Sequence, residues 1–149
     1  MFTGEATADG YALTGSLRLT RFVALSAQHT GVDSRRDATR RRLPGQPEHE
    51  TFVRLQLGPD PVWKVIGELS HVGEMLVSEG GSQRLPARTV WNASAALNLA
   101  EWPDLGLGSI VNELWLSARV NNIGDTAVRD AVAFPQPGRN ASAAIEVRW

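Results

Sequence analysis

Hydrophobic and polar residues alternate along several segments of this chain, most clearly in the last ten residues. From Asn140 onward every second residue up to the C-terminal Trp149 is apolar, and the residues between them are polar except Ala144. A period of two residues is typical of a β-strand with one apolar and one polar face. Chain ends are usually poorly ordered, so a terminal tryptophan indicates an end that is buried or recognised.

Six earlier segments show the same alternation, at residues 11–20, 23–28, 50–57, 63–70, 89–99 and 114–121. None of them keeps a helical period of 3.6 residues equally well. The pattern therefore predicts an all-β fold, an antiparallel meander of about seven amphipathic strands.

The connections between these segments differ in length. The turns near residues 20–21 and 58–61 are short, those at about 33–46, 73–86 and 122–138 are long, and 101–112 is intermediate. Outer-membrane barrels have short periplasmic turns and long extracellular loops, with strands that alternate between lipid-facing and lumen-facing residues. The sequence thus predicts part of a transmembrane β-barrel. If Trp149 lies on the periplasmic side, the first and last strands run downward and Met1 lies outside.

The strand count bears on domain organisation. About eight strands are needed to close a small barrel, and complete single-chain bacterial barrels have an even number. We therefore expect residues 1–149 to be a C-terminal segment of a larger barrel or a truncated product of one. The first residues lack a basic stretch followed by an apolar core, so no signal peptide is predicted. No apolar run approaches the ~18–20 residues of a membrane helix.

Composition narrows the possible chemistry. The 149 residues include no cysteine, which excludes disulfides and thiolate metal sites. The 15 Lys and Arg nearly balance the 16 Asp and Glu, so the whole chain offers no case for nucleic-acid binding. His29, His49 and His71 lie far apart, without the short spacing of a metal site. We predict no metal, no cofactor, no catalytic residues and no enzymatic activity.

The segment from Leu114 to Trp149 carries the most specific motif. Its marker residues are Asn121, Asn122, Asp125, Pro135, Pro137, Gly138 and Arg139, before a final strand that ends on an aromatic residue. In order and spacing it resembles the C-terminal end of a TonB-dependent outer-membrane receptor. Weaker similarities at residues 42–57 and 84–97 extend the resemblance over most of the chain.

Turn chemistry gives the same motif a structural role. Asn and Asp side chains end a strand through local hydrogen bonds, and Gly124 would permit the turn. Proline cannot donate to a β-ladder and therefore precedes the last strand, while Gly138 would allow a sharp bend.

The resemblance implies a function and a location. It implies that the chain is barrel wall of a Gram-negative outer-membrane receptor that imports iron–siderophore or a similar scarce nutrient. Expected partners are outer-membrane lipid, the barrel-assembly machinery through the strand ending at Trp149, and TonB only through a plug domain that this sequence lacks. Polar residues expected to face the interior are Arg18, Arg54, Glu68, Arg119, Glu146 and Arg148.

One basic cluster is a candidate ligand site in an extracellular loop. It contains Arg35, Arg36, Arg40, Arg41 and Arg42. Guanidinium groups pair bidentately with phosphates and carboxylates, so the cluster could bind lipopolysaccharide phosphate or an anionic chelate. The alternative is a solvated loop with no specific ligand.

Tryptophans mark the strand ends. Trp63, Trp102 and Trp149 adjoin the short-turn side, as an interfacial aromatic girdle predicts, and Trp91 is expected towards the outer rim. Trp115 falls on the polar face, which a girdle does not explain.

A soluble all-β ligand- or protein-binding module is the second hypothesis. It predicts that the apolar faces of residues 53–57 and 141–147 pack on each other. It also predicts recovery of a monomer from the aqueous phase without detergent.

Overall fold

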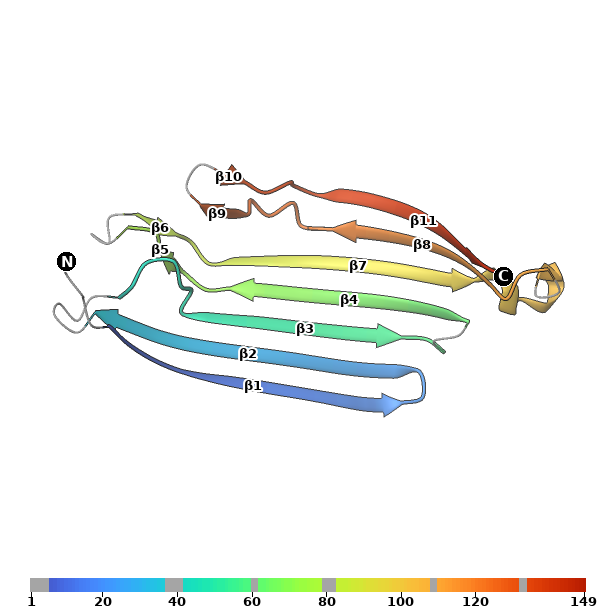
Figure 1. Ribbon diagram of the computed structural model, residues 1–149, viewed down its shortest axis with the longest axis horizontal. Coiled ribbons are helices and arrows are strands. Elements are labelled where there is room, and N and C mark those ends of the chain that lie inside the picture. The colour runs from blue at the N-terminus through green and yellow to red at the C-terminus, as the bar shows by residue number, and fades with distance from the viewer. Residues whose placement is uncertain (1–5, 37–41, 60–61, 79–82, 108–109, 132–133) are drawn as a thin grey trace.

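The computed structural model describes residues 6–36, 42–59, 62–78, 83–107, 110–131 and 134–149. A single seven-stranded antiparallel sheet, with the strands in sequence order, makes up most of it (Figure 1). Its strands are β1 (Ala6–Thr20), β2 (Val23–Arg36), β3 (His49–Leu57), β4 (Trp63–Val72), β7 (Arg88–Asn98), β8 (Glu113–Asn121) and β11 (Asn140–Arg148). The predicted all-β meander is confirmed.

Short elements occupy the connections between these strands. They are β5 (Met75–Leu76) paired with β6 (Arg84–Leu85), β9 (Arg129–Ala131) paired with β10 (Phe134–Pro135), and the 3₁₀ turns η1 (Leu99–Glu101) and η2 (Pro103–Leu105). Strands of two or three residues are too short to show a period, so the sequence did not predict them. No helix within the described residues is long and apolar enough to cross a membrane.

The hairpin of β1 and β2 is longer than the alternation predicts. Its pairing continues from the turn to Ala6 opposite Arg36. The loop expected from Asp33 was wrong at its start, because Arg35 and Arg36 are the last residues of β2. Polar side chains on both faces hide the period of two there, while backbone pairing persists.

Cross-strand register places the apolar residues of neighbouring strands opposite one another. Leu17 pairs with Leu25, which pairs with Leu55. At the other edge of the sheet, Leu97 pairs with Leu116, and Leu116 pairs with Ile145. Successive residues of a strand point to opposite faces, so the sheet has one apolar face and one polar face across all seven strands.

Within the described residues, neither face of the sheet is covered by a second layer. Among the described residues, Leu85 is the only buried hydrophobic side chain. Leu13 and Ile145 on the apolar face are 64% and 71% exposed. A soluble sandwich would bury such a face between two sheets. The apolar residues of the segments 53–57 and 141–147 instead lie on the same face of one sheet, so the packing expected for a soluble module is wrong.

The two ends of the sheet differ as the connection lengths predict. The turns β1–β2 and β3–β4, the β7–β8 connection and the C-terminus lie at one end, and the long connections lie at the other (Figure 1). We call these the short-turn end and the long-connection end. At the short-turn end, the Gly58 nitrogen donates to the Phe22 carbonyl over 2.8 Å, which links the two tight turns.

Gly58 has a conformation that other residues rarely adopt, with φ of +112°. A Cβ atom built there would lie 2.6 Å from Cε3 of Trp63, whose ring covers the glycine. We expect Gly58→Ala to lower the free energy of unfolding by roughly 1–3 kcal/mol, because of backbone strain and the clash with Trp63.

Urea unfolding of the chain in detergent micelles checks this expectation. Gly67→Ala is the matched control, because nothing lies within 4 Å of a Cβ built at Gly67. Equal urea concentrations at the unfolding midpoint for Gly58→Ala and Gly67→Ala would contradict the role assigned to Gly58.

Candidate functional site

The motif residues between β8 and β11 form a connected polar cluster, which we call the clasp: Asn122, Asp125, Thr126, Gly138 and Arg139. Asn122 is buried and has a left-handed φ of 52°. Its Oδ1 accepts from the Thr126 nitrogen over 2.9 Å, and its Nδ2 donates to the Thr126 carbonyl over 2.8 Å. The Asn122 side chain thereby pairs with both the backbone N–H and the carbonyl of Thr126, in the turn that follows β8.

The clasp is anchored to strand β7. The Asn122 nitrogen donates to Oδ1 of Asn92 over 2.9 Å, and Oγ1 of Thr126 donates to the Thr89 carbonyl over 2.9 Å. The Ile123 nitrogen donates to the Trp91 carbonyl over 2.8 Å. These bonds extend the β7–β8 pairing beyond the last paired residue of β8.

Asp125 connects the clasp to the last strand. Its Oδ1 accepts from the Arg139 nitrogen over 2.8 Å, immediately before β11 begins. A Cβ built on Gly138 would lie 2.6 Å from the same oxygen. A side chain at 138 would therefore require the Asp125 carboxylate to move away from the Arg139 nitrogen.

The left-handed residues of this turn are Asn122 and Asp125, each with φ of 52°. Asn and Asp tolerate a left-handed backbone better than most residues. Gly124 lies in the same turn, and neither Gly124 nor Gly138 has a positive φ.

Other motif residues lie close to the clasp. Asn121 donates from Nδ2 to Oδ1 of Asn140 over 2.9 Å, across the β8–β11 pair. Pro137 is exposed beside Gly138, and Pro135 lies in β10. Trp149 is 88% exposed beyond the end of β11. That these residues mark a family, or that Trp149 is recognised during assembly, stays a prediction.

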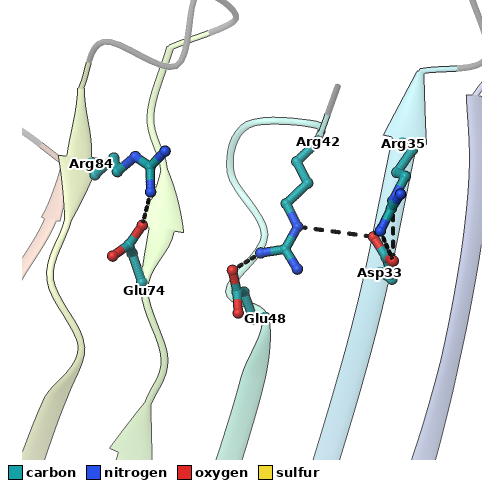
Figure 2. A network of polar contacts seen from close by, with 6 residues as sticks. All are labelled: Asp33, Arg35, Arg42, Glu48, Glu74 and Arg84. Atoms are coloured by element: carbon teal, nitrogen blue, oxygen red, sulfur yellow. Dashed lines mark hydrogen bonds and ion pairs between the residues drawn. The ribbon is translucent and has the colours of Figure 1, made fainter. Parts of the chain in front are cut away.

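The arginine cluster is paired with carboxylates where the structure describes its side chains (Figure 2). Nη2 of Arg35 lies 2.7 Å from Oδ2 of Asp33. Arg42 forms an ion pair with Glu48, and its Nε lies 3.9 Å from Oδ1 of Asp33. Arg36 is described only by its backbone, and Arg40 and Arg41 lie outside the described residues.

A second ion pair borders the same region. Nη1 of Arg84 lies 2.6 Å from Oε1 of Glu74 (Figure 2). With Arg42, Glu48 and Ser34, these residues line a cavity of about 240 Å³. Charges of both signs border this cavity. Anion binding by the arginine cluster stays a prediction.

The polar face carries a charge network across its middle. On β4, Oε1 of Glu68 lies 3.6 Å from Nη1 of Arg54 on β3. Its Oε2 lies 3.1 Å from Nη2 of Arg119 on β8. The Glu68 side chain is only 15% exposed. These ion pairs connect β3 to β4, and β4 to β8 across the intervening β7.

Trp115 lies on the polar face near the short-turn end and has polar partners. The Lys64 ammonium lies 4.8 Å from the centroid of its ring, and its Nε1 donates to Oε2 of Glu113 over 3.2 Å. The same Glu113 oxygen accepts from Arg148 over 3.1 Å. These groups, with Glu146, border an open cavity of about 620 Å³. Trp115 is therefore part of an amphipathic pocket and not of a girdle.

The structure brings together the three histidines, which the sequence treated as separate. His29 and His49 have ring centroids 6.2 Å apart, and those of His49 and His71 are 5.5 Å apart. In the described part of the chain, no three histidine or acidic side chains are arranged to hold a metal ion. The short β3–β4 turn fixes Thr51 opposite His71, so a register deduced from the turns could have revealed this proximity.

Comparison with known proteins identifies the fold. No protein-family model matches the chain, and no curated protein does. The solved structure of the copper transporter OprC matches it with a TM-score of 0.74 and 16% sequence identity over 98% of this chain. The match covers 24% of the transporter, so this chain spans about a quarter of its length. At this identity the likeness shows a shared fold.

The clasp gives a testable expectation for stability. Asn122→Ala removes both side-chain hydrogen bonds to Thr126 and places alanine at a φ of 52°. We expect the free energy of unfolding to fall by roughly 2–4 kcal/mol, measured by urea unfolding in detergent micelles.

Asn122→Gly separates the two causes, because glycine tolerates the left-handed backbone but lacks the side-chain bonds. It should lose less stability than Asn122→Ala. A midpoint for Asn122→Ala equal to that of the unmodified chain would contradict the clasp as described.

Proposed function

We propose that this chain forms part of the wall of an outer-membrane transport barrel. The observation that carries the proposal is the exposed apolar face, which continues across all seven strands with polar residues on the opposite face. A transmembrane barrel requires an apolar surface towards lipid and permits a polar interior. The shared fold with the copper transporter OprC supports a role in transport.

The polar face suits the inside of such a barrel. The network of Arg54, Glu68 and Arg119 and the pocket around Trp115 present charged groups of both signs. Such groups would be costly in lipid, where charged side chains on the outer face destabilise a barrel. They would contact water, a transported solute or polypeptide within the barrel.

The more specific proposal is a TonB-dependent receptor that imports iron–siderophore or a similar scarce nutrient. It rests on the resemblance of the motif from Asn121 to Arg139. Its support in the structure is that Asn122 and Asp125 tie the end of β8 to the start of β11. TonB would act through a plug domain, and the wall itself would do no covalent chemistry.

Among the described residues, the outer edges of β1 and β11 have no paired strand. Such edges promote pairing with other strands. In the proposed barrel, further strands pair with β1 and β11, and the assembly machinery recognises the strand ending at Trp149. Every residue of β11 is exposed, so its edge is accessible for this pairing.

Single-cysteine labelling tests the proposal, because the chain contains no native cysteine. Leu25→Cys and Leu116→Cys place a thiol on the apolar face, and the adjacent Ser26→Cys and Ser117→Cys place one on the polar face at matching depth. In phospholipid vesicles, a membrane-impermeant maleimide should label the serine-derived thiols and spare the leucine-derived ones.

In urea without lipid, all four variants should label equally, which controls for intrinsic reactivity. Equal labelling of both faces in vesicles would overturn the proposal. So would recovery of the chain as a monomer in the aqueous phase, the result expected of a soluble binding module.

A further inference from the structure

A small basic pocket lies on the polar face towards the short-turn end, over strands β1 to β3. It has a volume of about 210 Å³ and is lined by residues 16–18, 24–26, 54 and 56. We call it the arginine pocket, after Arg18 and Arg54. The described residues that line it include no carboxylate, in contrast to the cavities beside Arg42 and Trp115.

Cross-strand register builds this pocket from three strands. Ser16 of β1 pairs with Ser26 of β2, which pairs with Arg54 of β3. One step nearer the short turns, Arg18 pairs with Ala24. Neighbouring strands lie about 4.8 Å apart, so β1 and β3 are separated by about 10 Å, with β2 between them. The small side chains of β2 therefore form a floor, and one arginine flanks it on each side.

The hydrogen-bond donors of the pocket are available to a ligand. Arg18 has no ion pair or hydrogen bond with the described residues, and the hydroxyls of Ser16 and Ser26 make no hydrogen bond with them. Arg54 contacts one carboxylate, because its Nη1 lies 3.6 Å from Oε1 of Glu68. That distance is too long for a hydrogen bond. The N–H groups of Arg54 are therefore free to donate to a ligand.

Glu68 does not neutralise the pocket, because a second arginine shares it. Its Oε2 accepts a hydrogen bond from Nη2 of Arg119 over 3.1 Å, which is the closer of its two contacts. In this half of the polar face, the charged side chains of strands β1 to β4 are Arg18, Arg54, Lys64 and Glu68. Three cations against one carboxylate leave an excess of positive charge around the pocket.

This arrangement suits a tetrahedral oxyanion. A guanidinium group donates two parallel hydrogen bonds to the oxygens of a phosphate or a carboxylate. A carboxylate has two oxygens in one plane, whereas a phosphate group has three strong acceptor oxygens that point in different directions. Donors on both flanks and on the floor can therefore reach a phosphate together. The phosphate of a lipid is excluded in a barrel wall, because its acyl chains would have to lie on the opposite, apolar face.

We propose that the arginine pocket binds the phosphate group of a small anionic solute. The guanidinium groups of Arg18 and Arg54 hold the phosphate between them, and the hydroxyls of Ser16 and Ser26 donate to it from the floor. Binding itself needs only the polar face of the sheet, whereas its place inside a barrel rests on the proposed function. The pocket is separate from Arg35, which belongs to the arginine cluster at the long-connection end.

Modification of arginine by phenylglyoxal tests the pocket in the full chain in detergent micelles, with peptide mass spectrometry to follow each arginine separately. Inorganic phosphate should slow the modification of Arg18 about threefold relative to chloride at equal ionic strength, because the bound anion covers its guanidinium group. Acetate should protect Arg18 less than phosphate does. Arg139 is exposed and lies outside the pocket, so its rate should stay the same and reports any general effect of salt.

Two variants remove the site in different ways. Ala24→Leu fills the floor and should abolish the protection of Arg18 by phosphate. Ala96→Leu, the same change in the other cavity of the polar face, should keep that protection. Arg54→Gln should abolish it as well, because a single exposed guanidinium group gains little from an ion pair in water.

Equal protection of Arg18 and Arg139 would overturn the inference, and so would protection by acetate that equals that by phosphate. Protection that survives either Ala24→Leu or Arg54→Gln would also overturn it. Cysteine labelling in vesicles separates this inference from the proposed function. If the two faces label differently but phosphate does not protect Arg18, only the pocket fails. If the faces label alike and phosphate still protects Arg18, only the barrel wall fails.

Discussion

Cross-strand register holds the apolar side chains of seven strands on one face of a single sheet. A slip of one residue in any strand would move its whole apolar set to the other face. The tight turns at the short-turn end pin the register of the first four strands, and the bond from Gly58 to Phe22 ties those turns together. The clasp does the same for the last pair, because Asn122 and Asp125 fix where β8 ends and β11 begins.

In the part of the chain that the structure describes, no protein core stabilises this sheet. Backbone hydrogen bonds satisfy the strands internally, but the apolar side chains gain from burial only when something apolar covers them. In water, exposure of this apolar face is unfavourable. In a lipid bilayer its side chains would contact apolar acyl chains instead. The same arrangement explains the two ends of the sheet, since Trp63 at the short turns and the three histidines at the long connections lie at the limits of the apolar face.

The sequence predicted the seven strands and the face of each residue because a period of two is a local property. It failed where local pattern was absent or misleading. Polar residues hid the extension of β2 to Arg36, and β5, β6, β9 and β10 were too short to show a period. The period of two gives no sign of the left-handed backbone at Asn122 and Asp125. The proximity of the three histidines depends on the register of two strand pairs together, so no single segment reveals it.

Quenching of tryptophan fluorescence by brominated lipid tests most directly whether the apolar face contacts the bilayer. Trp91 lies on the apolar face and is 53% exposed, whereas Trp115 lies on the polar face beside Lys64. In vesicles whose acyl chains carry bromine, Trp91→Phe should remove quenchable emission, and Trp115→Phe should remove emission that bromine does not quench. Equal quenching in both variants, or none in the unmodified chain, would contradict a lipid-facing sheet.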